Sequence, residues 1–270
     1  MKNDLLKNIN FNEYQYDDLD CASLPMFSGG FVNFGYWKNL QYKNQKIISR
    51  ETRKSSSINL YKKALEFVGI EKSHTILEAG CGSGVGIPII AESSPRKIIG
   101  LDYFSSQIER AKARNKNFIN SNILELINAP AENTGLMTES IDRIISIESI
   151  QNFYCANSFI KESARLLKKN GRAIILTVFA LSKENAKKIN SLKPVGIKRT
   201  DHIMPIDEVI NYSIPHFNIN CIRIGENVFE GYNNYILGLD INHNELWSSN
   251  FYNSFKNGEI DYFIVILDKC

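Results

Sequence analysis

The sequence lacks both a long apolar run and a close pair of cysteines. No apolar stretch in its 270 residues approaches the length of a membrane-spanning helix, and residues 1–7 lack the apolar core of a signal peptide. The five cysteines lie far apart in the chain and form no C-x-x-C motif, which argues against a metal site or a thiol-based redox site. We therefore expect a reduced, cytoplasmic protein with no membrane segment and no bound metal.

An excess of charge of one sign is also absent. The chain has 32 basic and 29 acidic side chains, a net charge of +3, and no basic stripe of the kind that binds a phosphate backbone. Its hydrophobic share of 43% is ample for a buried core. These values predict a globular protein without a nucleic-acid partner. They leave the oligomeric state open, a homodimer included.

Two phosphate-binding motifs are missing from the main glycine-rich segment. A dinucleotide-binding loop requires G-x-G-x-x-G, but the third glycine position falls at Val85 when counted from Gly80, and at Ile87 when counted from Gly82. No G-K-[ST] follows, which excludes a P-loop. The segment is instead acid-x-G-x-G-x-G, formed by Glu78, Gly80, Gly82 and Gly84.

The surroundings of this loop indicate what it binds. It follows a short apolar strand at 74–77 and precedes an apolar helix at 87–91, and the next strand ends in Asp102. Strand, glycine turn, helix, strand and acid are typical of a nucleotide or nucleoside pocket on a parallel sheet. Glycines let the backbone pass close under a ligand. Glu78 suits a ligand with a positive amino group, and Asp102 is placed to accept hydrogen bonds from a ribose diol.

At this loop the chain resembles the class I S-adenosylmethionine-dependent methyltransferases, and the resemblance covers residues 58–180. Each matching segment is a weak signal, but their order and intervals together indicate the superfamily. Besides the loop they are Asp102–Gln107 after the second strand, Asn128–Glu132 after the third, Ser140–Glu148 as the fourth, and Leu166–Arg172 before the fifth.

The resemblance implies S-adenosylmethionine as the cofactor. In the family the glycine loop holds the methionyl part, the acid after the second strand holds the ribose, and the Ala131–Glu132 pair would border the adenine. The cofactor-binding residues implied in this way are Tyr36, Glu78, Gly80, Gly82, Gly84, Asp102, Gln107, Ala131, Glu132 and Glu148.

Alternation of strands with helices predicts an α/β protein, and the resemblance implies the Rossmann-like methyltransferase fold, a seven-stranded, mostly parallel sheet with an antiparallel last strand. Strands are expected at 74–79, 97–102, 123–128, 142–148, 171–179, 217–224 and 261–267. Helices are expected at 51–69 and at 156–168, where Asn170-Gly171 would form a left-handed stop. The parts expected are a helical N-terminal cap at 1–57, a cofactor-binding core at 58–180, a lid insertion after strand five at 181–216, and the rest of the core sheet at 217–270.

Asn33–Trp37 resembles the segment that covers the cofactor in family members that act on small natural products. In this interpretation Tyr36 donates a hydrogen bond to the cofactor carboxylate and Trp37 walls the site. The alternative is a hydrophobic anchor that packs the N-terminus onto the core. The glycine between large aromatic residues favours the first interpretation, because it indicates a close backbone approach.

Methyl transfer from a sulfonium requires alignment and exclusion of water, and it requires a base only if the nucleophile keeps its proton. Gln151 and Asn152 would orient a hydroxyl or amine at the end of the fourth strand, with helix capping as the alternative. Several related enzymes have a histidine at this place, and this chain has none. The candidate base is therefore His202, beside Asp201 in the expected lid, and ordinary polar surface is its alternative role.

These features predict a methyltransferase that modifies oxygen or nitrogen of a small, partly apolar acceptor, of the secondary-metabolite type, in a closed aromatic-lined pocket. A cyclase-type enzyme that binds the sulfonium without transferring its methyl group stays open. So does a cofactor-binding regulatory subunit. The glycine spacing counts against the remaining alternative, a dinucleotide oxidoreductase.

Overall fold

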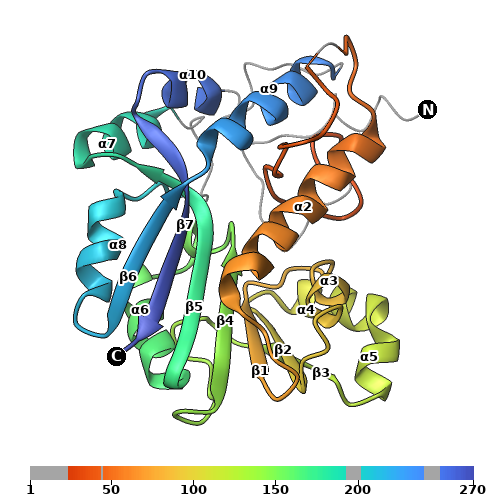
Figure 1. Cartoon of the computed structure of the whole chain (residues 1–270), viewed down its shortest axis with the longest axis vertical. Coiled ribbons are helices and arrows are strands. Elements are labelled where there is room, and N and C mark those ends of the chain that lie inside the picture. The colour runs from red at the N-terminus through yellow and green to blue at the C-terminus, as the bar shows by residue number, and fades with distance from the viewer. Residues whose placement is uncertain (1–23, 44, 193–201, 240–249) are drawn as a thin grey trace.

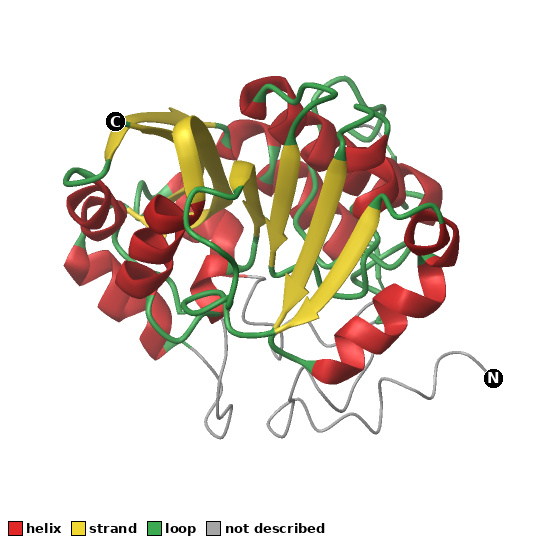
Figure 2. Cartoon of the chain, turned by 90° about the horizontal axis from the view of Figure 1, so that it is seen from below, coloured by secondary structure: helices red, strands yellow, loops and turns green. Residues whose placement is uncertain are grey.

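The computed structural model describes residues 24–43, 45–192, 202–239 and 250–270. Their strands form one seven-stranded sheet in the order β3-β2-β1-β4-β5-β7-β6, with helices on both faces (Figures 1 and 2). The strands are β1 (Thr75–Ala79), β2 (Lys97–Asp102), β3 (Leu124–Asn128), β4 (Ile141–Ile147), β5 (Leu167–Ala180), β6 (Phe217–Arg223) and β7 (Ile260–Lys269). In the described residues the α-helices are α2 (Arg50–Val68), α3 (Ile87–Ala91), α4 (Ser105–Arg114), α5 (Lys116–Asn120), α6 (Ala156–Leu166), α7 (Lys183–Ser191), α8 (Ile206–Ser213), α9 (Phe229–Leu237) and α10 (Phe251–Lys256), and the short 3-10 helices are η3 (Ile150–Asn152) and η4 (Gly225–Asn227).

The strand directions confirm the predicted fold class. Strands β1 to β5 pair in parallel with their neighbours, whereas β7 lies antiparallel between β5 and β6. In a parallel sheet the ligand site lies at the carboxyl ends of the strands, where the strand order reverses. Here that point is the pair β1 and β4, since the chain runs outward from β1 to β3 and then returns to β4.

Alternation along the strands decides which side chains meet α2. Ile76 of β1, Ile145 of β4 and Ile264 of β7 belong to the core cluster that also contains the buried residues of α2 and α3. Their neighbours Leu77 and Ile144 belong to the cluster on the opposite face, with α6 and α8. Because side chains alternate along a strand, Glu78 and Tyr262 point to the α2 face.

Helix α2 confirms the predicted helix at 51–69 but has a more polar buried face than its apolar pattern indicates. It begins after Ser49, whose hydroxyl accepts a hydrogen bond from the Thr52 amide, and it ends at Gly69, which is left-handed with φ 66°. Its buried residues include the polar or charged Arg53, Ser56 and Ser57 and the apolar or aromatic Leu60, Tyr61, Ala64 and Val68.

The prediction that Asn170-Gly171 ends α6 in a left-handed conformation is wrong about where the helix ends. Asn170 does adopt φ 63°, but the helix has already ended at Leu166, and Leu167 is extended with ψ 136°. Strand β5 starts at Leu167, and its register against β4 shifts between Ile141 and Arg143. The left-handed residue therefore belongs to this strand irregularity rather than to the helix end.

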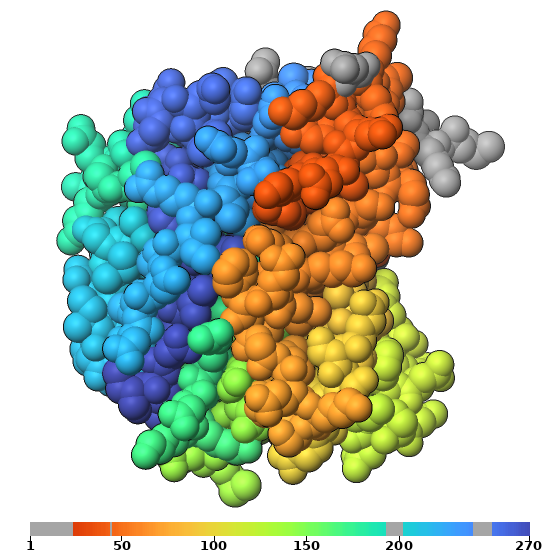
Figure 3. Space-filling model, viewed as in Figure 1, coloured from red at the N-terminus to blue at the C-terminus, as the bar shows by residue number. Residues whose placement is uncertain are grey.

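The segment predicted as a cap and the segment predicted as a lid pack on different parts of the core. Residues 24–43 and 45–49 form turns beside α9, as Figure 3 shows in red-orange against light blue. From the expected lid at 181–216, α7 packs on β5 and α8 packs on β6 and α6. Cover of the site by these segments stays a prediction.

Candidate functional site

The glycine loop joins β1 to α3 at the carboxyl edge of the sheet. Its three alternating glycines, Gly80, Gly82 and Gly84, all have positive φ, at 78°, 52° and 72°. This conformation costs residues with a Cβ atom roughly 1–2 kcal/mol each. The loop is tied to β2, since the amides of Gly80 and Cys81 both donate to the Leu101 carbonyl, at 2.8 and 2.9 Å.

The space around each glycine differs. A Cβ atom at Gly80 would lie 2.4 Å from that of Ser149, and one at Gly84 would lie 2.6 Å from Nδ2 of Asn115. At Gly82, by contrast, no described residue other than its two chain neighbours has an atom within 4 Å of that position. Gly80 and Gly84 are therefore required by packing, whereas Gly82 borders open space that a ligand can fill.

Glu78, the acid of the loop, is a buried carboxyl with half of its hydrogen-bonding capacity satisfied. It is 2% exposed, and its Oε1 accepts a 2.9 Å hydrogen bond from the hydroxyl of Tyr61 on α2. Within the described part of the chain, Oε2 of Glu78 has no hydrogen-bond partner. Burial, assisted by the charge of Asp102 and opposed by the Tyr61 hydrogen bond, raises the pKa of Glu78 to about 8.

Asp102 links the end of β2 to the glycine loop. Its Oδ2 accepts from the Gly82 amide at 2.9 Å, and its Oδ1 accepts from the Phe104 amide at 3.0 Å. Burial raises the pKa of this carboxyl, while its hydrogen bonds from backbone amides act in the opposite direction. Asp102 therefore also shapes the loop, in addition to the ribose-binding role that the sequence predicts.

Glu148 follows β4 in a left-handed conformation with φ 49°. Its Oε1 accepts from the Phe34 amide at 2.7 Å and from the Tyr262 hydroxyl at 2.8 Å. One carboxylate oxygen thus joins the end of β4, the N-terminal segment and β7. Its predicted role in cofactor binding stays a prediction, and the structure adds this contact with the N-terminal segment.

The other predicted cofactor residues, Gln107 and the Ala131–Glu132 pair predicted to border the adenine, follow β2 and β3 in the chain. Gln107 is buried on α4, and Ala131 is buried after β3. Oε1 of Glu132 accepts a 2.9 Å hydrogen bond from the amide of Cys155, the residue before α6. Glu132 therefore satisfies a backbone group at a helix start, where a carboxylate is favourable.

The structure places His202 beside η3, the short helix that holds the other two candidates for catalysis, Gln151 and Asn152. The His202 amide donates to the Gln151 carbonyl at 2.9 Å, and the Thr177 hydroxyl donates to Oε1 of Gln151 at 2.8 Å. The amide of Asn152, on η3 with Gln151, donates to the Ser149 carbonyl. His202 is exposed, and Asp201 lies outside the described residues.

Trp37 packs as the sequence's alternative interpretation, a hydrophobic anchor, would require. Trp37 is 1% exposed and lies in a cluster with Tyr42, Tyr232 and Tyr235. Tyr36 is half-buried, with its amide bonded to the Ser56 carbonyl at 2.8 Å. Trp37 therefore packs the N-terminal segment onto α9. The role of Tyr36 toward the cofactor stays a prediction.

Sequence reasoning missed Tyr61, Tyr262 and Ser149. Tyr61 lies in the middle of a helix, where its apolar spacing predicts core packing only. Tyr262 reaches the carboxyl edge because β7 runs antiparallel and pairs it with Val178 of β5. Ser149, whose hydroxyl donates to the Gly80 carbonyl at 3.1 Å, directly follows Glu148. Only for Ser149 did the sequence hold a signal, namely its place at a strand end.

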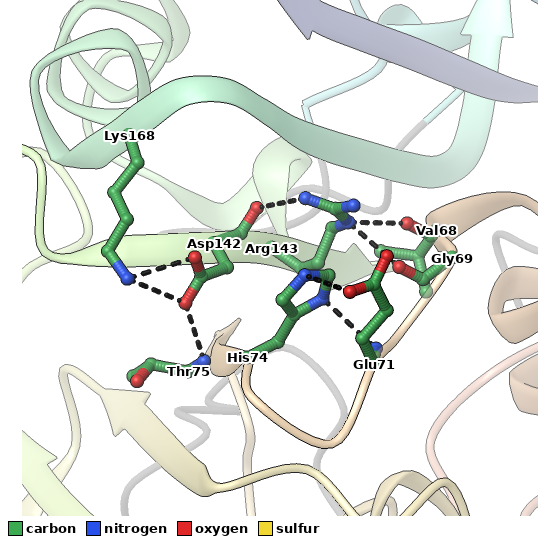
Figure 4. A network of polar contacts seen from close by, with 8 residues as sticks. All are labelled: Val68, Gly69, Glu71, His74, Thr75, Asp142, Arg143 and Lys168. Carbon is green, nitrogen blue, oxygen red and sulfur yellow. Dashed lines mark hydrogen bonds and ion pairs between the residues drawn. The ribbon is translucent and has the colours of Figure 1, made fainter.

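His74 lies away from these groups, at the amino end of β1 (Figure 4). Its Nδ1 accepts a 3.0 Å hydrogen bond from the Glu71 amide, and Asp142 nearby binds the Thr75 amide and the Lys168 ammonium group. This network closes the turn before β1 and has no contact with the glycine loop.

Within residues 24–43, 45–192, 202–239 and 250–270, no group of three or more His, Cys, Asp or Glu side chains is arranged to hold a metal ion. None of the helices in that part of the chain is both long and apolar enough to cross a membrane.

Residues 77–175 match the family model of a methyltransferase domain. A probable S-adenosylmethionine-dependent methyltransferase of Mycolicibacterium smegmatis is 30% identical over 104 residues, 38% of this chain and 37% of that protein. The erythromycin 3''-O-methyltransferase of Saccharopolyspora erythraea is 25% identical over 53% of this chain and 44% of its own length. The matched part of this chain thus spans less than half the length of these relatives.

Solved structures share the fold over nearly the whole chain. The geranyl diphosphate C-methyltransferase of Streptomyces coelicolor superposes with a TM-score of 0.75 and 11% identity, over 97% of this chain and 99% of that one. The [4+2]-cyclase SpnF superposes with a TM-score of 0.67 and 15% identity, over 88% of each chain. At these identities the likeness establishes the fold alone.

Proposed function

We propose that this chain is a class I S-adenosylmethionine-dependent methyltransferase and that it methylates oxygen or nitrogen of a small, partly apolar acceptor. The observation that carries this proposal is the buried carboxyl of Glu78 beside a glycine loop that is open at Gly82. The two features together suit a ligand that has both an ammonium group and a flat nucleoside.

The residues present fit the cofactor. Oε2 of Glu78 is a buried acceptor that no described residue satisfies, so an incoming ammonium group would complete its hydrogen bonding. Open space beside Gly82 leaves room for the ligand against the backbone. When bound, S-adenosylmethionine supplies a methyl group already activated by its sulfonium. The methionyl part would lie at Glu78 and Gly82, and the ribose at Asp102.

The remaining task of the protein is to align the acceptor and exclude water. Gln151 follows β4, and His202 lies beside it because the His202 amide donates a hydrogen bond to the Gln151 carbonyl. In this proposal Gln151 or Asn152 orients the acceptor, and the His202 imidazole accepts the proton that a hydroxyl or amine loses. The buried aromatic cluster around Phe34 supports a partly apolar acceptor, since this ring packs on Phe251 and Tyr232 at 5.5 and 4.6 Å.

A cyclase-type function is the second candidate. Gln151 and Asn152 leave the end of β4 without a histidine. SpnF, whose name describes a [4+2]-cyclase, has this fold. Methyl transfer is favoured because the sequence relatives named above are methyltransferases.

Calorimetric titration with S-adenosylmethionine, S-adenosylhomocysteine and NADH tests the proposal. We expect both sulfur compounds to bind and NADH not to bind. Candidate acceptors with hydroxyl or amine groups are then screened by mass spectrometry for the gain of one methyl group. Binding of NADH alone would overturn the cofactor assignment. A product formed without a mass change, while the cofactor is retained, would favour the cyclase.

Asp102→Ala is expected to weaken S-adenosylmethionine binding by about 1.5–3 kcal/mol, the range for hydrogen bonds to a charged group. Calorimetry gives the affinity, and circular dichroism checks that the loop change leaves the fold intact. Asp268→Ala is a matched control, because this half-buried carboxylate of β7 pairs with Arg172 of β5, away from the loop. Unchanged affinity in the Asp102 variant would remove the ribose assignment.

His202→Ala is expected to lower turnover about 100-fold or more, the range for loss of general base catalysis, with little change in cofactor affinity. Once an acceptor is known, kcat is compared with the dissociation constant of S-adenosylmethionine. His216→Ala is the control, since His216 lies before β6 at the opposite edge of the parallel strands. Wild-type turnover in the His202 variant would exclude this residue as the base.

A further inference from the structure

Glu78 and Tyr61 form a buried pair that the proposed chemistry does not explain. The Tyr61 ring lies against the backbone of Gly86, where a Cβ atom would be 2.1 Å from the ring, and it packs on Phe31 at 5.7 Å. With its ring fixed on both sides, its hydroxyl is held 2.9 Å from Oε1 of Glu78. Helix α2 thus determines which oxygen of Glu78 is left for a ligand.

The neighbours of Glu78 decide the charge of this carboxyl. From α2 it faces the Tyr61 phenol, from β2 the Asp102 carboxylate, and from the loop the Cys81 thiol. Further out, the charge of Glu148 acts on Tyr61 and on Tyr262. Burial, opposed by the Tyr61 hydrogen bond and assisted by the Asp102 charge, raises the pKa of Glu78 to about 8, and burial keeps Tyr61 a phenol by raising its pKa well above 10.0. At neutral pH the ligand-free carboxyl therefore holds a proton.

We propose that Tyr61 is a positioning residue that aims the free oxygen of Glu78 at the cofactor ammonium group, and that cofactor binding releases the proton of Glu78. This inference rests on the proposed function. The proton leaves the carboxyl for solvent, and the resulting carboxylate accepts hydrogen bonds from the Tyr61 hydroxyl at Oε1 and from the ammonium group at Oε2. No other bond forms or breaks.

The release can be counted by calorimetry. S-adenosylmethionine is titrated into the full chain in buffers of different ionisation enthalpy at about pH 6 to 7, below the usual range for an α-amine, so the ligand is already an ammonium ion. We expect release of about one proton and an affinity that rises roughly tenfold per pH unit. 5′-Methylthioadenosine, which lacks the ammonium group, is expected to bind without proton release.

Two variants separate the pair from the rest of the site. Glu78→Gln is expected to bind without proton release at any pH. Tyr61→Phe keeps the packing on Gly86 but removes the donor, so the affinity at about pH 7 is expected to fall about tenfold or more, with proton release retained. Glu125→Gln on β3, an exposed carboxylate paired with Lys97, is the control and should behave as wild type.

A measurement on the ligand-free protein gives an independent readout. The folded state holds the Glu78 proton up to about pH 8, because burial raises its pKa, whereas the unfolded chain loses this proton near the usual pKa of 4.5. Stability is therefore expected to fall as pH rises between these values, and Glu78→Gln should lack this part of the fall. Tyr61→Phe should extend it to higher pH.

The outcomes distinguish this inference from the proposed function. Absence of S-adenosylmethionine binding by the wild type would overturn the proposed function. Binding without proton release, or release that persists in Glu78→Gln, would overturn the role of Glu78 alone. A Tyr61→Phe variant that keeps both the affinity and the pH profile of the wild type would show that Tyr61 serves packing only.

Discussion

Replacing Gly80 by alanine is expected to destabilise the protein by about 2–5 kcal/mol and to abolish measurable cofactor binding. The left-handed conformation at φ 78° contributes roughly 1–2 kcal/mol of this loss. The new Cβ atom would lie 2.4 Å from that of Ser149, and such overpacking costs about 1–3 kcal/mol. Chemical denaturation and calorimetric titration measure the two effects.

Other glycines separate the causes. Gly82→Ala has the same conformational cost, but its Cβ atom meets no described residue within 4 Å, so we expect a larger loss of affinity than of stability. Gly69→Ala, at the end of α2 with φ 66°, should lose stability only. In Gly80→Ala, the further change Ser149→Gly should restore part of the stability. Full stability of Gly80→Ala alone would contradict the close packing of the loop on Ser149.

Replacing Trp37 by alanine is expected to cost about 3–5 kcal/mol of stability, the range for removing a buried large aromatic side chain. Trp37 packs on α9, and its indole nitrogen donates to the Phe34 carbonyl at 3.0 Å. The Arg53 guanidinium lies 5.9 Å from its ring centre and also bonds the Asn33 carbonyl. Loss of the indole should therefore release the N-terminal segment, and with it the contact between Phe34 and Glu148.

Gly231 of α9 tests the same contact from the other side. Alanine usually stabilises a helix by about 1 kcal/mol relative to glycine. Here the new Cβ atom would lie 2.2 Å from Cγ of Trp37, so Gly231→Ala should instead be destabilising. Gly238→Ala, at the end of the same helix, is the control, because its Cβ atom would lie 3.4 Å from the nearest atom, the Tyr235 carbonyl oxygen. If Trp37→Ala lowered turnover and left stability unchanged, Trp37 would line the site rather than anchor the segment.

Local sequence was sufficient for the elements whose signals are local. The strand before Glu78, the alternating glycines and the acid at Asp102 follow one another directly in the chain, and the structure places them at one edge of the sheet. Their spacing excludes a dinucleotide loop without reference to the fold. The fold class was predictable for the same reason, since the alternation of strands and helices follows from local sequence patterns in their order along the chain.

The tertiary structure decided what no local pattern encodes. Tyr61 reads as a core residue of α2, and only packing on Gly86 aims its hydroxyl at Glu78. Tyr262 reaches the site because β7 runs antiparallel beside β5. Glu148 and Phe34, which are 114 residues apart, meet through one hydrogen bond. The raised pKa of Glu78 follows chiefly from burial, and burial is a property of the folded chain because distant segments exclude the water.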